Sequence, residues 1–103
     1  MRRRRRVQPV VWFTRYRPAV WARDSGFCQG PYCTHQPPIP LEQAHIDHIV
    51  PLSRGGNNAL DNLRTLCRRC HVLRAGREHQ GMIAGALRDG IIPPDWRPLV
   101  WDG

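Results

Sequence analysis

One short stretch of this chain, AHIDHIVPLS from Ala44 to Ser53, places residues capable of acid–base and metal chemistry side by side. Asp47 and His48 are adjacent in a segment that alternates apolar and polar residues, which predicts a strand whose neighbouring side chains point to opposite faces. One of the two can bind a cation while the other acts on a water molecule. Together with Asn62 and His71 downstream, they predict a metal-dependent phosphodiesterase site.

Each residue of this set suits a particular task. A mixed carboxylate and imidazole set is what a catalytic cation with open positions requires, so Asp47 and His71 are the predicted ligands. His48 is the predicted general base, because a neutral imidazole accepts a proton without placing a second carboxylate beside phosphate. Asn62 would orient that base or brace the loop between the strands. His45 shares the face of Asp47, which leaves three roles open: an extra cation ligand, a phosphate contact or a helper in orientation.

Four cysteines offer either one tetrahedral metal site or two disulfides, and they are Cys28, Cys33, Cys67 and Cys70. The start MRRRRRVQPVVWFTRYRP has no apolar run long enough for a secretory signal. We therefore expect a cytoplasmic protein, whose reducing surroundings favour a structural zinc site with four thiolates. No segment approaches the ~20 apolar residues of a membrane span.

The formal net charge is +8 in a chain of 103 residues, and arginine supplies it. Guanidinium groups bind phosphate through a planar fork of donors, so a polyanionic partner is expected. The predicted phosphate-binding residues are Arg54, Arg64, Arg68, Arg69 and Arg74. Residues 1–10 should form a basic, disordered arm that can lie along a phosphate backbone. The four tryptophans are expected in the core rather than stacked on bases.

The order of elements before the second cysteine pair can also be predicted. A short helix is expected over Thr14 to Asp24, where Pro18 would be tolerated only in the first turn. A knuckle follows over Phe27 to Cys33, with a Gly30-Pro31 turn that brings two thiols together. Leu41 to Val50 reads as a strand with a bend near its end, stopped by Pro51.

The remaining elements complete a strand, loop, strand and helix order. SRGGNN, from Ser53 to Asn58, is a loop, and Leu63 to Cys67 is a second strand. A helix should begin at the second cysteine pair and run from Arg68 to about Arg77. Met82 to Arg88 predicts another short helix closed by Gly90, and Ile91 to Asp102 predicts a tail packed across the domain.

The combined motifs resemble the HNH endonucleases. The resemblance rests on Asp47-His48-Ile49-Val50-Pro51-Leu52, Gly55-Gly56, Asp61-Asn62-Leu63 and Leu66-Cys67-x-x-Cys70-His71. It covers about residues 15–74 and implies a small α+β chain with the ββα-metal fold, as one nuclease domain over residues 11–103. It also implies one divalent cation (Mg²⁺, Mn²⁺ or another) on the scissile phosphate of DNA, water activated by His48, and 5′-phosphate and 3′-hydroxyl products. The Cys-x4-Cys spacing of the first pair is wider than the usual Cys-x2-Cys of this family.

Two other function classes fit parts of the pattern. A non-catalytic zinc-ribbon-like module would bind nucleic acid but has no need of the Asp47, His48, Asn62 and His71 set. A secreted basic protein stapled by disulfides would oxidise its cysteines. Because no helix has a distinct sequence-reading face, specificity should be low or supplied by a partner protein. Small nucleases of this kind often serve bacteriophage DNA packaging or homing, and we expect a monomer or weak dimer that nicks one strand or cuts both.

Overall fold

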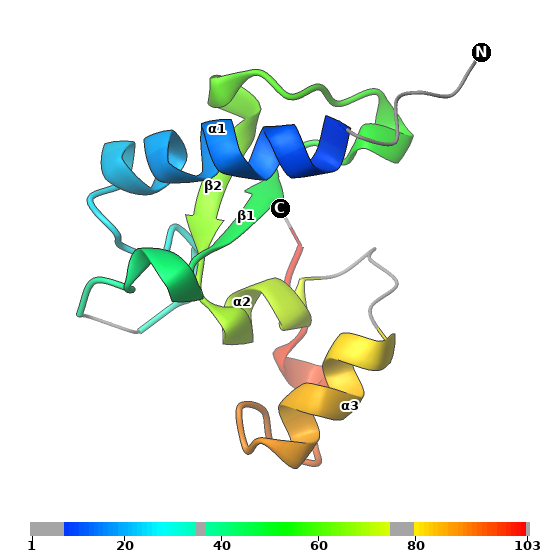
Figure 1. Ribbon diagram of the computed structural model, residues 1–103. Helices are drawn as coiled ribbons and strands as arrows, with labels where there is room; N and C mark the ends of the chain where they lie inside the picture. The colour runs from blue at the N-terminus through cyan, green and yellow to red at the C-terminus, as the bar shows by residue number, and fades with distance from the viewer. Residues whose placement is uncertain (1–7, 35–36, 75–79, 103) are drawn as a thin grey trace.

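A two-stranded antiparallel sheet lies at the centre of the chain, between helices on its two faces (Figure 1). The computed structural model describes residues 8–34, 37–74 and 80–102. Strands β1 (His45–His48) and β2 (Leu63–Leu66) are followed by the short helix α2 (Arg68–Leu73). Helix α1 (Gln8–Arg23) covers one face, and α2 with α3 (Gln80–Arg88) covers the other. This is the predicted strand, loop, strand and helix order, so the α+β class is confirmed.

The register of the sheet separates two sets of side chains. His45 pairs with Leu66 and Asp47 with Arg64, while Ile46 and His48 pair with Thr65 and Leu63. Because side chains alternate along a strand, the first two pairs share one face and the last two share the other. Ile46 and Leu63 pack with Val20 under α1, whereas Leu66 joins the core beneath α2 and α3. His48 therefore lies on the opposite face from His45 and Asp47.

Strand β1 is shorter than predicted. A single turn of 3-10 helix, η2 (Leu41–Gln43), replaces its expected beginning, because Pro40 precedes it without a backbone donor. After β1 the chain keeps one more ladder bond, from Ile49 N to the carbonyl of Asn62 at 2.9 Å, and turns away at Pro51. Two further turns, η3 (Leu52–Arg54) and η4 (Leu60–Asn62), build the connection to β2.

Helix α1 is longer than predicted and contains Pro18 in its interior. The prediction that Pro18 could stand only in the first turn was therefore wrong. Pro18 is exposed, so its ring does not have to fit against the core. The helix begins at Gln8, which also removes part of the arm expected over residues 1–10. Residues 1–7 lie outside the described part of the chain.

Helix α2 ends earlier than predicted because Arg74 leaves the helix. Its backbone is extended (φ −69°, ψ 128°), and it forms a bridge with Trp101 near the carboxyl end of the chain. The Trp101 N–H donates to the carbonyl of Leu73 at 3.1 Å. This pairing ends the helix at Leu73, four residues before the predicted end.

The carboxyl-terminal third packs as predicted. Gly90, with a φ of 72°, closes α3 and turns the chain, and Ile91 N donates to the carbonyl of Ala86 at 2.8 Å. Ile92 and Trp101 then enter the core formed by α2, α3 and Leu66. No helix in the described ranges is both long and apolar enough to cross a membrane.

Candidate active site and metal centre

The four cysteine sulfurs converge on one point. Their Sγ atoms all lie within 4.8 Å of one another, and those of Cys33 and Cys67 are 3.9 Å apart. A tetrahedral zinc ion with Zn–S bonds of about 2.3 Å separates its sulfurs by about 3.8 Å, so the spacing fits this ion. No disulfide joins these four described residues. The cluster is thus compatible with a structural zinc ion despite the enlarged Cys-x4-Cys knuckle.

The backbone around the knuckle is shaped to the sulfurs. The Cys33 N–H donates to the carbonyl of Gly30 at 3.1 Å, which closes the predicted turn. The amides of Gly30 and Cys67 both point at the sulfur of Cys28, at 3.4 and 3.2 Å. A Cβ at Gly30 would stand 2.9 Å from the Cys70 sulfur, so a side chain there would disturb the cluster. Such amide donors favour sulfur in its thiolate form.

The thiols of Cys67 and Cys70 differ in pKa. A hydrogen bond with Cys28, followed by one with Cys70, lowers the pKa of Cys67 to about 3. The same hydrogen-bonding partnership, with Cys28 first and Cys67 next, raises the pKa of Cys70. The hydrogen bonds thus favour the thiolate of Cys67 and the protonated thiol of Cys70. A zinc ion among the sulfurs would stabilise thiolates, so the donor set fits this ion.

His48 and the two asparagines near it form a polar group at the end of the sheet. The Nε2 atom of His48 lies 2.8 Å from Oδ1 of Asn58. Asn62 accepts a bond at Oδ1 from Val50 N (2.8 Å) and donates from Nδ2 to the carbonyls of Val50 (3.1 Å) and Asn57 (2.8 Å). Asn62 thus braces the loop, one of the two roles that the sequence allowed. Asn58 is the residue that contacts the histidine.

The loop also depends on a glycine. The Gly56 N–H donates to the carbonyl of Pro51 at 3.0 Å, and a Cβ at Gly56 would lie 1.8 Å from the carbonyl oxygen of Val50. No side chain fits there, because backbone atoms cannot give way as a flexible side chain can. The loop that presents Asn58 and Asn62 therefore needs glycine at this position.

Asp47 is engaged by two arginines. Its side chain is 0% exposed, and its Oδ2 accepts hydrogen bonds from Arg64 Nε at 2.9 Å and from Arg74 Nη1 at 2.6 Å. Arg74 donates further to the carbonyls of His48 and Ile49, the second at 2.6 Å. The prediction of Asp47 as a cation ligand did not include these two arginine partners at Oδ2. The difference arises because the β1–β2 register sets Arg64 opposite Asp47 and the end of α2 brings Arg74 to the same oxygen.

Trp101 lies against this arginine pair. Its ring centroid is 5.1 Å from the guanidinium carbon of Arg64 and 6.0 Å from that of Arg74, within cation–π range. Its indole N–H donates to the carbonyl of Cys70 at 2.9 Å. The tail therefore covers the two arginines, which are 9% and 6% exposed. Their burial differs from the prediction that Arg64 and Arg74 contact DNA phosphates.

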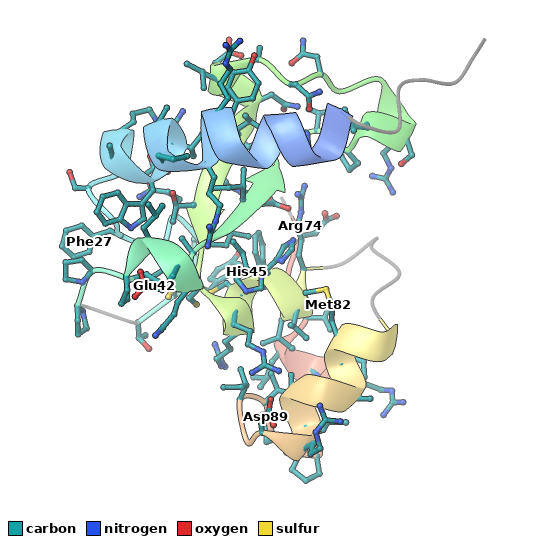
Figure 2. All side chains as sticks on the ribbon, in the orientation of Figure 1. Phe27, Glu42, His45, Arg74, Met82 and Asp89 are labelled. Atoms are coloured by element: carbon teal, nitrogen blue, oxygen red, sulfur yellow. The ribbon has the colours of Figure 1, made fainter. Side chains whose placement is uncertain are left out.

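His71 meets His45 between β1 and α2. Their Nδ1 atoms are 2.9 Å apart, and their ring centroids are 5.0 Å apart at an interplanar angle of 62°. Figure 2 shows the side chains of His45 and Arg74 in the space between the sheet and α2. Burial, followed by the charges of Arg68 and Arg17, lowers the pKa of His45 and favours its neutral form.

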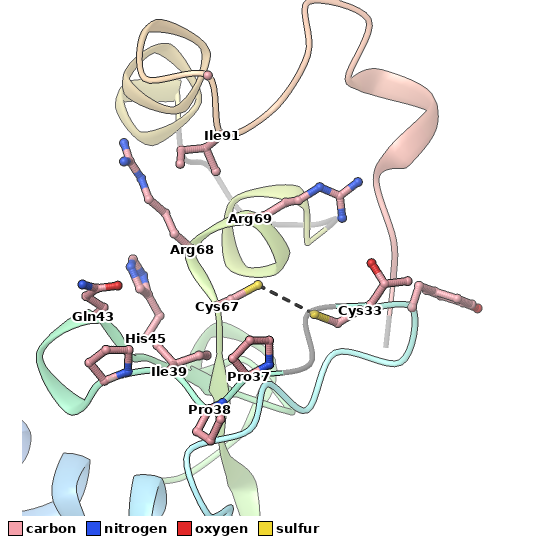
Figure 3. Close-up of a pocket in the computed structure, with 14 residues that line it drawn as sticks. Cys33, Pro37, Pro38, Ile39, Gln43, His45, Cys67, Arg68, Arg69 and Ile91 are labelled. Carbon is pink, nitrogen blue, oxygen red and sulfur yellow. Dashed lines mark hydrogen bonds between the residues drawn. The ribbon is translucent and has the colours of Figure 1, made fainter.

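The remaining predicted arginines lie nearer the surface. Arg54, in η3, and Arg69, in α2, are exposed. Arg68 bonds Asp89 at 2.9 Å while its side chain stays 38% exposed. Arg68, Arg69, Cys67 and His45 line one hollow of about 1230 Å³ between the knuckle, the proline-rich segment and α2 (Figure 3). This hollow carries positive charge beside the histidine pair.

Sequence reasoning missed two contributors to the site. Asn58 stands ten residues after His48 in a loop, where no periodicity predicts which amide meets the ring. Trp101 reaches the arginine pair from the far end of the chain, and its aromatic character predicted burial but not its neighbours. The pairing of Asp47 with Arg64 could have been inferred from the sequence, because the register of two predicted strands determines which residues lie opposite each other.

The comparisons with known proteins place the site in a family. The model of the family described as HNH endonuclease matches residues 28–76, which include all four cysteines, both strands and α2. Searches of curated proteins and of solved structures gave no significant match. The matched segment holds the Asp47-His48 pair, Asn62 and His71 in the order that the sequence motifs indicated. Residues 28–76 of the chain therefore match an HNH endonuclease domain.

Proposed function

We propose that this protein is a metal-dependent endonuclease that hydrolyses phosphodiester bonds of DNA. The observation that carries the proposal is the contact between His48 Nε2 and Asn58 Oδ1, within the segment that matches the HNH model. A second histidine of this segment, His71, lies at the opposite face of the same strand. An amide oxygen can only accept a hydrogen bond, so Asn58 favours the tautomer of His48 with its proton on Nε2. The lone pair is then on Nδ1.

The protein's part in the reaction follows from that tautomer. Nδ1 of His48 removes a proton from a water molecule aligned with the scissile phosphate, and Asn58 holds the ring in place by accepting from Nε2–H. Asn62 maintains the loop that carries Asn58. Arg54 and Arg69, both exposed, neutralise neighbouring phosphates. A divalent cation bound on the His71 face would stabilise charge on the phosphate and the leaving oxygen.

Two features support DNA as the substrate class. The net charge of +8 favours a polyanion, and the HNH family is one of nucleases. Because phosphate contacts carry no sequence information, we propose low intrinsic sequence specificity, raised where needed by a partner protein. Most of the affinity should then come from the phosphate backbone.

The proposal is tested by separating DNA binding from DNA cleavage. Single-turnover cleavage of a labelled duplex is measured for the wild-type chain and for His48→Ala at saturating protein. We expect His48→Ala to bind the duplex as the wild type does and to lose cleavage by about 10²- to 10⁴-fold, the usual contribution of a general base. Equal cleavage by both proteins contradicts the role of His48.

The second candidate function is a zinc-stabilised module that binds nucleic acid without cutting it. The arginine pair on Asp47 favours it, because two guanidinium groups at Oδ2 oppose the approach of a cation to that oxygen. This candidate predicts tight, salt-sensitive duplex binding with no cleavage under any divalent ion. The same duplex assay therefore separates the two functions.

A further inference from the structure

The outer edge of β2 is covered by the segment that includes the end of α1 and the start of the knuckle. One edge of β2 pairs with β1, and residues 23–29 contact the other. The Thr65 N–H donates to Oδ2 of Asp24 at 2.9 Å, and the Thr65 carbonyl accepts from Gln29 N at 2.8 Å. The polar groups of this strand edge are therefore bonded within the chain.

Arg23, the last residue of α1, binds the beginning of the same edge. Its Nε and Nη2 atoms lie 3.0 and 3.1 Å from the two carboxylate oxygens of Asp24, whose side chain is 8% exposed. Nη1 donates to the carbonyl of Leu60 and Nη2 to that of Leu63, both at 2.7 Å. Each nitrogen of the guanidinium thus has an acceptor, and Asp24 fixes the group while it holds the two carbonyls.

The loop that ends at Asn62 has little apolar packing to fix its position. The structure describes all of residues 51–62, and none of them is buried. Asn62 holds the loop through its bonds to Val50 and Asn57, which lie within the connection between the strands. Arg23 adds a tether from a different element, at carbonyls on either side of Asn62.

We propose that Arg23 is a positioning residue for hydrolysis, because its hold on η4 keeps Asn58 against His48. The proposal rests on the proposed function for the role of His48 as the base. Asn58 stands two residues before Leu60, the first residue of η4. A displacement of about 1 Å in such a support can cost about 10²-fold in rate. Lysine cannot replace Arg23, since a single ammonium lacks the planar fork of donors.

The first measurement follows hydrogen exchange of backbone amides in the zinc-loaded full chain, without DNA. The N–H groups of Ile49 and Asn62 report on the loop, and that of Ile91, bonded to Ala86, reports on the core. We expect Arg23→Lys to speed exchange of the two loop amides about tenfold more than exchange at Ile91, because the loop opens locally. A purely global loss of stability would speed all three alike.

Arg17→Lys is the matched control for this measurement. Arg17 also lies on α1 and donates to two backbone carbonyls, those of Leu41 at 2.6 Å and Ala44 at 3.3 Å. These carbonyls precede β1, so loop exchange relative to Ile91 should stay at the wild-type value. Zinc content and circular dichroism establish that each variant is folded.

The second measurement is a double-mutant cycle on the cleavage rate. Single-turnover cleavage at saturating protein is compared for the wild type, Arg23→Lys, Asn58→Ala and the double variant. We expect Arg23→Lys to slow cleavage about 10- to 100-fold alone, and by less than about threefold in the Asn58→Ala background, because both residues act through one contact. Duplex affinity should stay within about threefold of wild type, since lysine keeps the charge.

The outcomes distinguish the role of Arg23 from the proposed function. Equal speeding of loop and core amides in Arg23→Lys overturns the proposal, as does the same loss of rate with and without Asn58. If the loop amides respond selectively and the wild type does not cut DNA, the nuclease proposal fails while Arg23 remains the tether of the loop. If the wild type and Arg23→Lys cut DNA at the same rate, the positioning role fails while the nuclease proposal stands.

Discussion

His48 and Asn58 form a contact whose chemistry depends on one nitrogen. With Asn58 Oδ1 accepting at 2.8 Å from Nε2, the ring is held in one tautomer and one orientation. Asn57, its neighbour in the same loop, instead accepts at Oδ1 from the backbone N–H of Ala59 at 3.0 Å. Asn58 therefore positions the histidine, whereas Asn57 stabilises the loop.

Replacing Asn58 should slow the chemical step without weakening DNA binding. We expect Asn58→Ala to lower the single-turnover cleavage rate by about 10- to 100-fold, the range seen when a partner that orients a histidine is removed. Asn58→Asp keeps an acceptor oxygen and should retain more activity than Asn58→Ala. The rates are measured at saturating protein, and the dissociation constant is measured separately.

Asn57→Ala is the matched control for this prediction. It removes a loop hydrogen bond without touching His48, so its cleavage rate should stay within a few-fold of wild type. Equal loss of rate in Asn57→Ala and Asn58→Ala would assign the effect to the loop and not to the histidine.

At the scale of elements, Arg74 at the end of α2 and Trp101 in the carboxyl-terminal segment pack against the two strands. Arg74 donates to Asp47 and to the carbonyls of His48 and Ile49, and Trp101 covers it. A buried carboxylate is tolerated only with such partners, since desolvation strongly penalises an unpaired charge. The tail is therefore part of the site's scaffold.

Removing Arg74 should destabilise the fold strongly. Arg74→Ala leaves two strand carbonyls without their donor and Asp47 with Arg64 as its remaining arginine partner. We expect the free energy of unfolding to fall by about 3–5 kcal/mol, the usual cost of breaking a buried pair. Urea unfolding of the zinc-loaded chain measures this change.

Arg68→Ala, at the first residue of α2, provides the control. It breaks the exposed ion pair with Asp89 and should cost about 0–1 kcal/mol. A loss in Arg74→Ala no larger than that in Arg68→Ala would show that the buried network contributes little to stability.

The elements differ in how far sequence could predict them. Alternation and Pro51 located β1, and Gly90 located the end of α3, because these signals are local. The early end of α2 was missed, since it depends on a bridge between Arg74 and Trp101, which are 27 residues apart. Pro18 was misjudged because its effect depends on exposure, which the sequence does not specify.

For the candidate site, too, the sequence predicted some features and not others. Cysteine spacing predicted which four residues cluster, and strand alternation predicted that His48 faces away from His45 and Asp47. The contacts of Asp47 with Arg74 and of His71 with His45 were not predictable, because they depend on how α2 crosses the sheet. Sequence motifs name the reactive residues, while tertiary packing decides which of them meet.

At the scale of the whole molecule, the cysteine cluster joins distant parts of the chain. Cys28 and Cys33 come from the knuckle, Cys67 is the N-cap of α2 and Cys70 lies in α2, so one ion would join the knuckle to this helix. In Cys67→Ser we expect zinc to be lost together with cooperative folding, because zinc binding supplies folding free energy in a chain this small. Metal analysis and thermal unfolding measure both; a variant that keeps the wild-type midpoint would exclude the structural role.

The basic amino terminus should add affinity without adding chemistry. Deleting Arg2 to Arg6 removes charges that lie outside the described residues. We expect weaker duplex binding and a shallower slope of log affinity against log salt, by about 0.9 for each phosphate that the arm no longer neutralises. Cleavage at saturating protein should be nearly unchanged. Identical affinity and slope in the truncated chain would show that the arm does not touch DNA.

The central claim, that the chain is a metal-dependent DNA endonuclease, is tested most directly on supercoiled plasmid. Zinc-loaded protein is incubated with the plasmid under a panel of divalent ions, with and without a chelator, beside His48→Ala. We predict nicked or linear product that requires a divalent ion, disappears with the chelator and falls by about 10²- to 10⁴-fold in His48→Ala. Intact plasmid under every ion, or equal cleavage by His48→Ala, would contradict the claim.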